Sequence, residues 1–580
     1  MVAHRKGTAR NQLSFICLED LIAQDNIVRV IDAFVDIIDF EKLGFAHIQP
    51  KKTGTPPYHP ALLLRLYLYG YLNRVRSSRK LEAECKRNIE MQWLCEMQTP
   101  CYHTIATFRT YKNDETKINH QKALKEVFRT FNRFLNGEAV FGKETVATDG
   151  AKMRAQNAKK KNYTEDKLNK KIELSEANIA KYLDELDQYD TAESLNEEQT
   201  LLQSDAKAKL EELKKWNTTF KELKKELTKR QEIDPAVTQI SQTDPDARSI
   251  VVNNSGHAEV AYNLVTAVDD KNKLIVHFFT DNVHDTALLA ESLIAVKAEF
   301  DTDFDENLYQ STENAENTEG VDLTKKLNKD TYLNGLADKG FHSAAQLQEC
   351  KDNNIITYVA IPQLAYSGKE KEFQINNFKY NETDDTYTCP NNQTLTTNGT
   401  LYNKKNRRGI VITQFKRYNT APSICANCPF ANKCLSKTAI KYRVSRQLER
   451  TLNQEAVNDN KNRLNTAKGK NLYRKRQAIV EHPYGIIKRQ WAIDHTLLKG
   501  MEKVNAEFAI VCTCYNLRRA VSILSAKTLI DKLKAIKNTQ KGHQTHFFNP
   551  ILTYAEKIVR IFRFYFNFAL NQNITQQRIA

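Results

Sequence analysis

The first part of the chain has the spacing of apolar residues that is typical of helices. Over residues 18–46, and again over residues 59–73, apolar side chains return every three or four positions, as they do along one face of an α-helix. A basic run follows, and then a third predicted helix over residues 81–88. We therefore expect a basic, helical unit over residues 1–135, which either presents a helix to a DNA groove or carries only a solvated basic surface.

The pattern changes to that of β-strands near Thr145. A β-rich run ends in an acid and a glycine, so we expect a strand that ends at Asp149. Further on, the pattern predicts strands over residues 261–268 and 274–279, a helix over 285–300, a strand over 331–337, a helix over 344–352 and a strand over 355–361. The order βββαβαβ predicts an α/β (α+β) fold with a mixed-sheet core.

A polar insertion rich in Lys and Glu interrupts this order over residues 159–234. It contains two runs with heptad spacing. The first run is Leu168, Ile172, Ser175, Ile179, Tyr182 and Leu186, and the second is Leu213, Trp216, Phe220, Leu223 and Leu227. This spacing predicts two helices that pack along a shared seam as a hairpin arm.

A second insertion, over residues 365–444, is rich in strand and turn signals and contains clustered cysteines. The core is therefore divided: its first part comprises residues 140–158 and 235–364, and its last helices lie over residues 445–530. The final residues, 531–580, form a basic, aromatic tail.

Composition and charge narrow the functional classes. The 580 residues carry a formal net charge of +16, which favours a polyanionic partner, with nucleic acid first and an anionic membrane surface second. No run approaches the roughly 18 apolar residues of a membrane span, and no apolar run follows the basic N-terminus as in a secretory signal. We expect a cytoplasmic protein whose 11 cysteines are thiols or metal ligands.

Three carboxylates are candidates for metal-dependent chemistry: Asp149 and Asp338, which end predicted strands, and Glu481 on a late helix. Elements in this order would bring them to one edge of the sheet. Phosphodiester chemistry uses two Mg²⁺ ions held by oxygen ligands, and carboxylates supply such ligands. Each acid taken singly is as well explained by a turn or a helix cap.

The sequence around these acids resembles a known family. The segments DGAK at 149–152, ADKGF at 337–341 and EHPYGIIK at 481–488 resemble the acidic motifs of RNase H-like DDE transposases of bacterial insertion sequences. The segment YHTIATFR at 102–109 is similar to the motif that ends the helical N-terminal domain in one branch of that family. The resemblance covers roughly residues 10–525.

The resemblance implies an RNase H-like fold in which Asp149, Asp338 and Glu481 are catalytic and bind two Mg²⁺ ions, with Mn²⁺ able to substitute. It implies strand cleavage at the ends of an insertion sequence and strand transfer into target DNA. The partners would be double-stranded DNA and a second copy of the chain, on the nucleoid. Two alternatives stay open: a nuclease of the same fold without joining activity, and a non-catalytic DNA-binding protein.

Four residues are expected to contact DNA. In the family pattern a Tyr and an Arg precede the Glu and a Lys follows it, which here are Tyr473, Arg476 and Lys488, and Lys152 follows the first acid. Glu481 and Lys488 would share a face of a continuous helix, but the proline between them predicts a kink or a helix start. Lys488 is either a phosphate contact or a solvated lysine.

Other acids have simpler explanations. Asp244 and Asp246 precede a strand, where a turn or a structural pair with Arg248 is expected. Asp281 and Asp285 lie just before a predicted helix, so we interpret them as N-caps.

Four cysteines have a spacing that suits a metal. Cys425 and Cys428 form a CxxC knuckle, Cys434 follows six residues later, and Cys389 precedes a proline at a strand end. Four thiolates suit tetrahedral zinc. Two interpretations stay open, a zinc site and free thiols in a small β insertion. The other seven cysteines are expected in the core.

Overall fold

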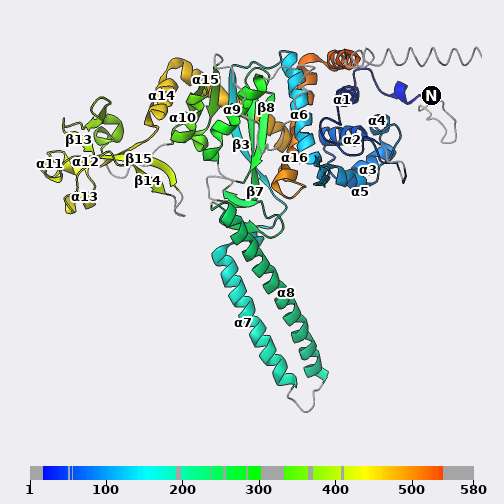
Figure 1. Cartoon of the computed structure of the whole chain (residues 1–580), viewed down its shortest axis with the longest axis horizontal. Coiled ribbons are helices and arrows are strands. Elements are labelled where there is room, and N and C mark those ends of the chain that lie inside the picture. Colours follow the sequence, from blue (N-terminus) through cyan, green and yellow to red (C-terminus); the bar gives the residue numbers. More distant parts are fainter. Residues whose placement is uncertain are drawn as a thin grey trace, which may run out of the picture. The chain divides into compact units, whose positions relative to one another are not determined.

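The computed structural model describes residues 17–49, 53–54, 56–190, 197–235, 237–251, 257–282, 285–301, 332–362, 370–405 and 411–539 (Figure 1). The chain divides into two compact units. One contains residues 1–131 and 516–580, and the other contains residues 132–515. Residues 302–331 and most of the predicted tail, from residue 540, lie outside the described residues.

The first unit is helical, as the spacing predicts. Its helices include α1 (Ile27–Asp36), α2 (Pro60–Leu72), α3 (Ser78–Arg87), α4 (Ile89–Leu94) and α5 (Tyr102–Thr110), and residues 526–539 are also helical. The first predicted helix, 18–46, is too long: a 3₁₀ turn precedes it, and Asn26 caps the start of α1 by accepting a hydrogen bond from the Val28 amide.

Helix α2 is buried on almost every side. Its one charged residue, Arg65, is compensated by two acids of α1, because its guanidinium pairs with Asp32 at 2.8 Å and also with Asp36. A helix that is apolar all round forms the centre of this unit.

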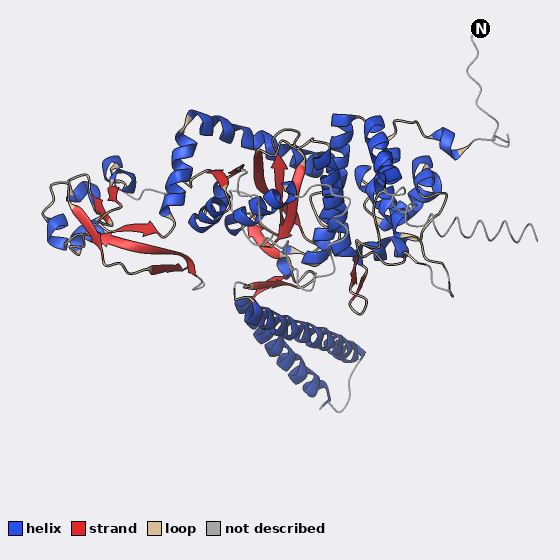
Figure 2. Ribbon diagram, turned by 45° about the horizontal axis from the view of Figure 1, so that its top comes forward, coloured by secondary structure: helices blue, strands red, loops and turns tan. Residues whose placement is uncertain are grey.

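The second unit is built on a mixed sheet (Figure 2). Its strands are β3 (Thr145–Arg154), β6 (Arg248–Val251), β7 (Ala258–Asp269), β8 (Ile275–Asp281), β9 (Leu333–Ala337) and β10 (Ile355–Val359). The sheet order is β10-β9-β3-β7-β6, and β8 also pairs with β7. Strand β3 is antiparallel to β7 and parallel to β9, and β9 is parallel to β10. The α/β class is confirmed. The predicted elements occur in the order βββαβαβ, but the sheet also contains β6, a strand between β3 and β7 in the sequence that the pattern did not predict.

Helices cover the sheet from both faces. They are α9 (Leu289–Phe300), α10 (Ala344–Asp352), α14 (Gln454–Asn465), α15 (Ala467–Tyr484) and α16 (Met501–Leu524). Successive side chains of a strand point to opposite faces. In β3, the Thr148 hydroxyl meets Ser292 of α9 at 3.2 Å, whereas the next side chain, Asp149, meets Arg476 of α15. Helices α9 and α15 therefore contact opposite faces of β3.

The expected end of the first strand is wrong. Strand β3 does not stop at Asp149 but continues to Arg154, because its antiparallel ladder with β7 continues to the pair of Arg154 with Ala261. Asp149 therefore lies within the strand. The strand before Asp338 does end where it was predicted, at Ala337.

The first insertion forms the predicted helical hairpin, with α7 (Glu165–Asp190) and α8 (Glu197–Ile233) side by side (Figure 1). A two-stranded clip of β4 (Asn162–Thr164) and β5 (Gln239–Ser241) closes its base. One cluster near the base contains Tyr163, Leu168, Phe220, Leu227 and Ile240, and a second contains Leu186, Ala206 and Leu210.

The prediction is wrong for one residue of the seam between the two helices. Trp216 is 52% exposed, and the neighbouring position takes its place, since the Ser175 hydroxyl donates a hydrogen bond to the Asn217 carbonyl at 3.1 Å. This polar pair sets the contact between the two helices at that level.

The second insertion contains a small antiparallel sheet. Its strands are β11 (Lys379–Asn381), β12 (Thr386–Thr388), β13 (Thr394–Thr397), β14 (Tyr402–Lys405), β15 (Val411–Asn419) and β16 (Leu448–Thr451). Three short helices follow β15: α11 (Pro422–Ala426), α12 (Ala431–Cys434) and α13 (Lys437–Lys441). No helix in the described part of the chain is long and apolar enough to cross a membrane.

The seam of the arm gives a test with a matched control. Phe220 is 8% exposed, so Phe220→Asp places a charge in the seam and should destabilise the hairpin by about 3 kcal/mol or more. Trp216→Asp, on the same helix but outside the seam, should change stability far less. Thermal unfolding of the segment 157–243 followed by circular dichroism measures both. Equal losses for the two variants would contradict the assigned seam.

Candidate active site

Strand pairing brings two of the predicted acids together. In the parallel ladder of β3 and β9, Thr148 is the partner of Ala337, so the residues that follow, Asp149 and Asp338, are neighbours at the end of β9. Asp338 caps a short 3₁₀ turn by accepting a hydrogen bond from the Gly340 amide at 2.7 Å. Asp149 accepts one from the Gly150 amide at 2.8 Å.

A third acid, Asp285, reaches the same place from the segment before α9. A Cβ atom on Gly150 would lie 2.4 Å from an Asp285 carboxylate oxygen, and one on Gly340 would lie 3.5 Å from the other oxygen. Position 150 must therefore be glycine for this carboxylate to approach the strand.

Asp285 is held by a polar network rather than by a helix end. The Lys152 ammonium donates to its two oxygens at 2.9 and 3.2 Å, and the Asn263 amide donates to it at 2.6 Å. The N-cap of α9 is Leu288, without a side-chain cap. The N-cap interpretation of Asp285 is therefore wrong. The Asp281 carboxylate accepts a hydrogen bond from the Asn282 amide, and it too does not cap α9.

Helix α15 brings Tyr473 and Arg476 to Asp149. An Arg476 guanidinium nitrogen lies 3.7 Å from the Asp149 carboxylate, close enough for an ion pair but too far for a hydrogen bond. The same guanidinium lies 5.9 Å from the centre of the Tyr473 ring. Burial raises the pKa of Tyr473, so its hydroxyl stays protonated beside the acids.

Tyr484 ties the end of α15 to the sheet. Its hydroxyl lies within hydrogen-bond distance of two backbone carbonyls, 2.9 Å from that of Asp149 and 3.0 Å from that of Leu264, and it accepts a hydrogen bond from the Thr266 hydroxyl at 2.9 Å. Burial, and then the nearby Asp149 carboxylate, raise the pKa of Tyr484 well above its ordinary value. The hydroxyl therefore remains a donor to β3 and β7.

Glu481 is not brought to the two aspartates. Its side chain is exposed and accepts a hydrogen bond from the Gln477 amide, one turn earlier, at 2.8 Å. It nevertheless precedes Tyr484 by only three residues, which places both on adjacent parts of the α15 surface.

The proline neither starts nor ends the helix. Helix α15 runs through Pro483 to Tyr484 and continues into a π-helical turn over Gly485–Gln490. Lys488, within this turn, is half-buried and donates a hydrogen bond to the Lys152 carbonyl at 3.1 Å. Because a π-helical turn contains an extra residue, Glu481 and Lys488 do not share one exposed face.

The acids predicted to be structural are so. Asp244 accepts hydrogen bonds from the Tyr262 hydroxyl at 2.7 Å and the Gly500 amide at 3.1 Å. Asp246 accepts from the Met501 amide at 2.8 Å and pairs with Arg230, at the end of α8, at 2.7 Å. These two acids fix the start of α16 and the base of the arm.

Electrostatics set Asp149 apart from an ordinary surface acid. Burial raises its pKa from 3.8 to about 6, against the Gly150 amide and the Arg476 guanidinium, which lower it, and Asp338 and Asp285 raise it further. The donor set is rich in oxygen, as hard divalent cations require. Among the described residues, no three His, Cys, Asp or Glu side chains are close enough to hold a metal ion as they stand.

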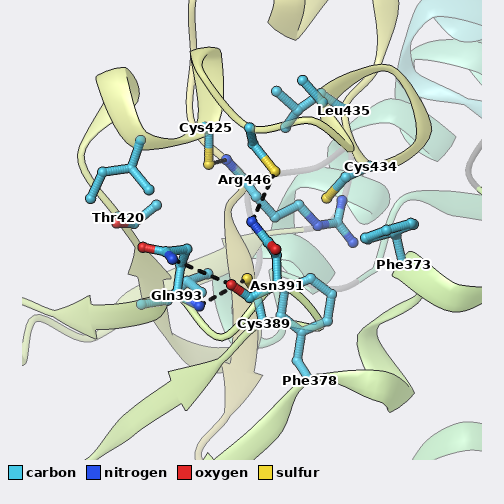
Figure 3. Close-up of a pocket in the computed structure, with 14 residues that line it drawn as sticks. Phe373, Phe378, Cys389, Asn391, Gln393, Thr420, Cys425, Cys434, Leu435 and Arg446 are labelled. Carbon is cyan, nitrogen blue, oxygen red and sulfur yellow. Dashed lines mark hydrogen bonds between the residues drawn. The ribbon is translucent and has the colours of Figure 1, made fainter.

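The four predicted zinc ligands lie together at a different place. Cys389, Cys425, Cys428 and Cys434 line a single cavity in the second insertion (Figure 3). This cavity contains none of the acids.

Two family models match the chain. The first, described as a transposase domain (DUF772), matches residues 16–111, and the second, a transposase DDE domain, matches residues 388–521. No curated protein and no solved structure matches. The second match includes Glu481 and the four clustered cysteines, whereas Asp149 and Asp338 lie outside both matches.

The two matches support a DDE transposase of an insertion sequence, the family that the resemblance names. The mixed helix and sheet core is consistent with an RNase H-like fold. Such transposases bind DNA and normally use divalent metal ions.

Sequence reasoning missed two members of this site. Asn263 gave no signal, because a single Asn within a buried strand has no motif around it. Tyr484 lies inside the third acidic motif, but it follows a proline, and a proline predicts a break in the helix more strongly than a tyrosine at this position predicts a role in the site. The sequence around Asp285 predicts a helix cap, and only the folded chain shows that its carboxylate lies against Gly150.

The raised pKa of Asp149 predicts a pH-dependent effect of removing its charge. The folded protein binds the proton of the Asp149 carboxyl more tightly than the unfolded chain does. The free energy of unfolding of the wild type therefore falls as the pH rises from about 4 to about 6. Asp149→Asn cannot bind this proton, so its free energy of unfolding does not fall for this reason. Without added divalent cations, the variant's melting temperature should exceed that of wild type by an amount that grows over this range and is constant above it. Calorimetry at a series of pH values tests this. A difference independent of pH would contradict the assigned environment.

Proposed function

We propose that the protein is a DNA transposase that cleaves DNA strands at the ends of an insertion sequence and joins them to target DNA. The observation that supports this most directly is the register of β3 and β9, which makes Asp149 and Asp338 neighbours under helix α15. Glu481, from that same helix, completes the proposed set of three catalytic acids.

The residues fit divalent cations in charge and in donor type. Asp149, Asp338 and Glu481 are the proposed ligands of two Mg²⁺ ions, and Mn²⁺ should substitute for Mg²⁺. When bound, the cations would supply an activated oxygen nucleophile and neutralise the charge on the leaving oxygen.

When no metal is bound, positively charged side chains of the protein pair with acids of the site. Arg476 pairs with Asp149, and Lys152 pairs with Asp285, so these two acids each have a positive neighbour. Tyr484 holds the backbone of Asp149 against α15. These contacts keep the proposed metal-binding carboxylates in place between cycles of reaction.

We propose double-stranded DNA as the partner, bound by two copies of the chain. Tyr473, Arg476, Lys488 and Lys152 are the proposed DNA contacts. All four now have partners within the protein, so a phosphate would compete with these contacts for Arg476 and Lys152. The net charge of +16 supports a polyanionic partner.

A nuclease of the same fold would use the same acids, and a non-catalytic DNA-binding protein would use none. Incubation with DNA that contains the element's ends, in Mg²⁺, separates these alternatives. Nicked and joined products support the transposase, nicked products alone support the nuclease, and binding without cleavage supports the non-catalytic protein.

The catalytic assignment predicts that Asp149→Asn, Asp338→Asn and Glu481→Gln each abolish cleavage and joining while DNA binding survives. An amide preserves size but removes the negative charge, and two close divalent cations cannot be held without anionic ligands. Strand cleavage and end binding are measured separately on the same DNA.

The control is Asp459→Asn, which removes an exposed acid of α14 that pairs with Lys351 at 2.8 Å and not with the acidic site. It should cleave at the wild-type rate. If any one of the three amide variants also cleaves at that rate, that residue is not a metal ligand, and Asp285 becomes the first replacement to test.

Phosphate contacts predict a change in salt dependence. Arg476→Ala and Lys488→Ala should each weaken DNA binding and reduce the slope of log K against log salt by about one unit. Lys351→Ala, which removes an exposed lysine on α10, is the control and should leave the slope unchanged. Unchanged slopes in the first two variants would mean that Arg476 and Lys488 do not contact phosphates and serve only in their contacts within the protein.

A further inference from the structure

Four cysteines from separate segments meet in the second insertion. Cys389 follows β12, Cys425 lies in α11, Cys428 lies between α11 and α12, and Cys434 ends α12. They line one cavity of about 30 Å³ (Figure 3).

Three of the four sulfurs already accept hydrogen bonds from N–H groups. The Gln393 amide lies 3.3 Å from the sulfur of Cys389, and the Arg446 amide lies 3.5 Å from that of Cys425. The side-chain amide of Asn391 lies 3.5 Å from that of Cys428. N–H donors of this kind surround the ligands of metal sites.

One buried nitrogen of an arginine beside the cavity lacks a hydrogen-bond partner. Arg446 lines the cavity, and its guanidinium Nε is buried without a hydrogen-bond partner in the described part of the chain. The guanidinium lies over the Phe378 ring, 5.6 Å from its centre. Four thiolates around a divalent cation carry a net charge of −2, which would compensate this arginine.

The short helices of the insertion have no apolar anchor. Helices α11, α12 and α13 contain no buried residue. The core of the insertion is small: Phe378, Tyr387, Leu395, Tyr418 and Leu448, with Cys389 and Cys434 packed against it. Between Pro422 and Lys441 only Leu435, which is 7% exposed, is buried, so hydrophobic burial does little to fix this segment. Small units of this kind use disulfides or metals in addition.

We propose that Cys389, Cys425, Cys428 and Cys434 bind one Zn²⁺ ion, which fixes the short helices α11 and α12 to the sheet of the insertion. The cation would lie between the knuckle of Cys425 and Cys428 on one side and the strand end at Cys389 on the other. The thiols lose their protons to solvent as the metal binds. This site is independent of the acidic site and of its proposed chemistry.

The sulfurs do not yet form a closed tetrahedron, since no three of them stand close enough to hold an ion in their present rotamers. Each sulfur moves by rotation about one side-chain bond, without a change in the backbone. Zinc is the expected metal because four thiolates in a closed site suit a soft, tetrahedral, redox-inactive cation.

The test uses the full chain purified in a reducing buffer without added metal. Elemental analysis should find about one zinc per chain in wild type. Cys428→Ser should lower the zinc content at least tenfold, whereas Cys101→Ser, which alters an exposed cysteine elsewhere, should not change it. Replacement of zinc by Co²⁺ should give the visible absorption of tetrahedral thiolate coordination.

Cys428→His keeps the proposal testable if the serine variant does not fold. Imidazole is also a zinc ligand, so this variant should retain about one zinc and shift the Co²⁺ spectrum. Wild-type protein that is folded but contains no zinc and takes up no Co²⁺ would overturn the proposal. So would four thiols oxidised to two disulfides, or a Cys428→Ser variant with unchanged zinc.

Discussion

The parallel pairing of β3 with β9 is the constraint on which the acidic site depends. Its register makes Asp149 and Asp338 neighbours, and it sends the Asp149 side chain toward α15. A slip of one residue would reverse every side chain of β3. Asp149 would then face α9, and the buried Thr148 would face α15. Such a slip would break the ion pair of Asp149 with Arg476 and the contact of Thr148 with Ser292, so the observed register is favoured.

Charge compensation follows from this geometry. Asp338 and Asp285 raise the free energy of ionising Asp149, which is itself buried. Lys152 comes from β3 and Arg476 from α15, so two separate elements compensate two of the three acids. The free protein is stable with these pairs, and a divalent cation must provide more favourable contacts than they do. Glu481, exposed one turn from Tyr484, is the acid that such a cation would have to recruit.

The sequence was sufficient for the class of fold, for five of the six core strands, for the end of β9 before Asp338 and for the helical hairpin, because each depends on local periodicity. It was not sufficient for features decided by pairing between distant segments. The length of β3 depends on the ladder with β7, and the place of Asp285 depends on the missing Cβ of Gly150. The exposure of Trp216 depends on the polar pair across the arm. The direction of Glu481 depends on how α15 packs, which its own sequence does not determine.

Each insertion is held at its two ends by contacts close to the core. This explains how the acidic site is kept together although the insertions separate its parts in the sequence. The arm starts and ends in the clip of β4 and β5. The second insertion leaves after β10 and returns at α14, where Asn460 donates to the Val359 carbonyl at 2.8 Å and accepts from its amide at 2.9 Å. With the ends pinned, the cost of closing each loop grows only slowly with its length. The strand that carries Asp338 and the helix that carries Glu481 therefore keep their places, whatever fixes the insertion between them.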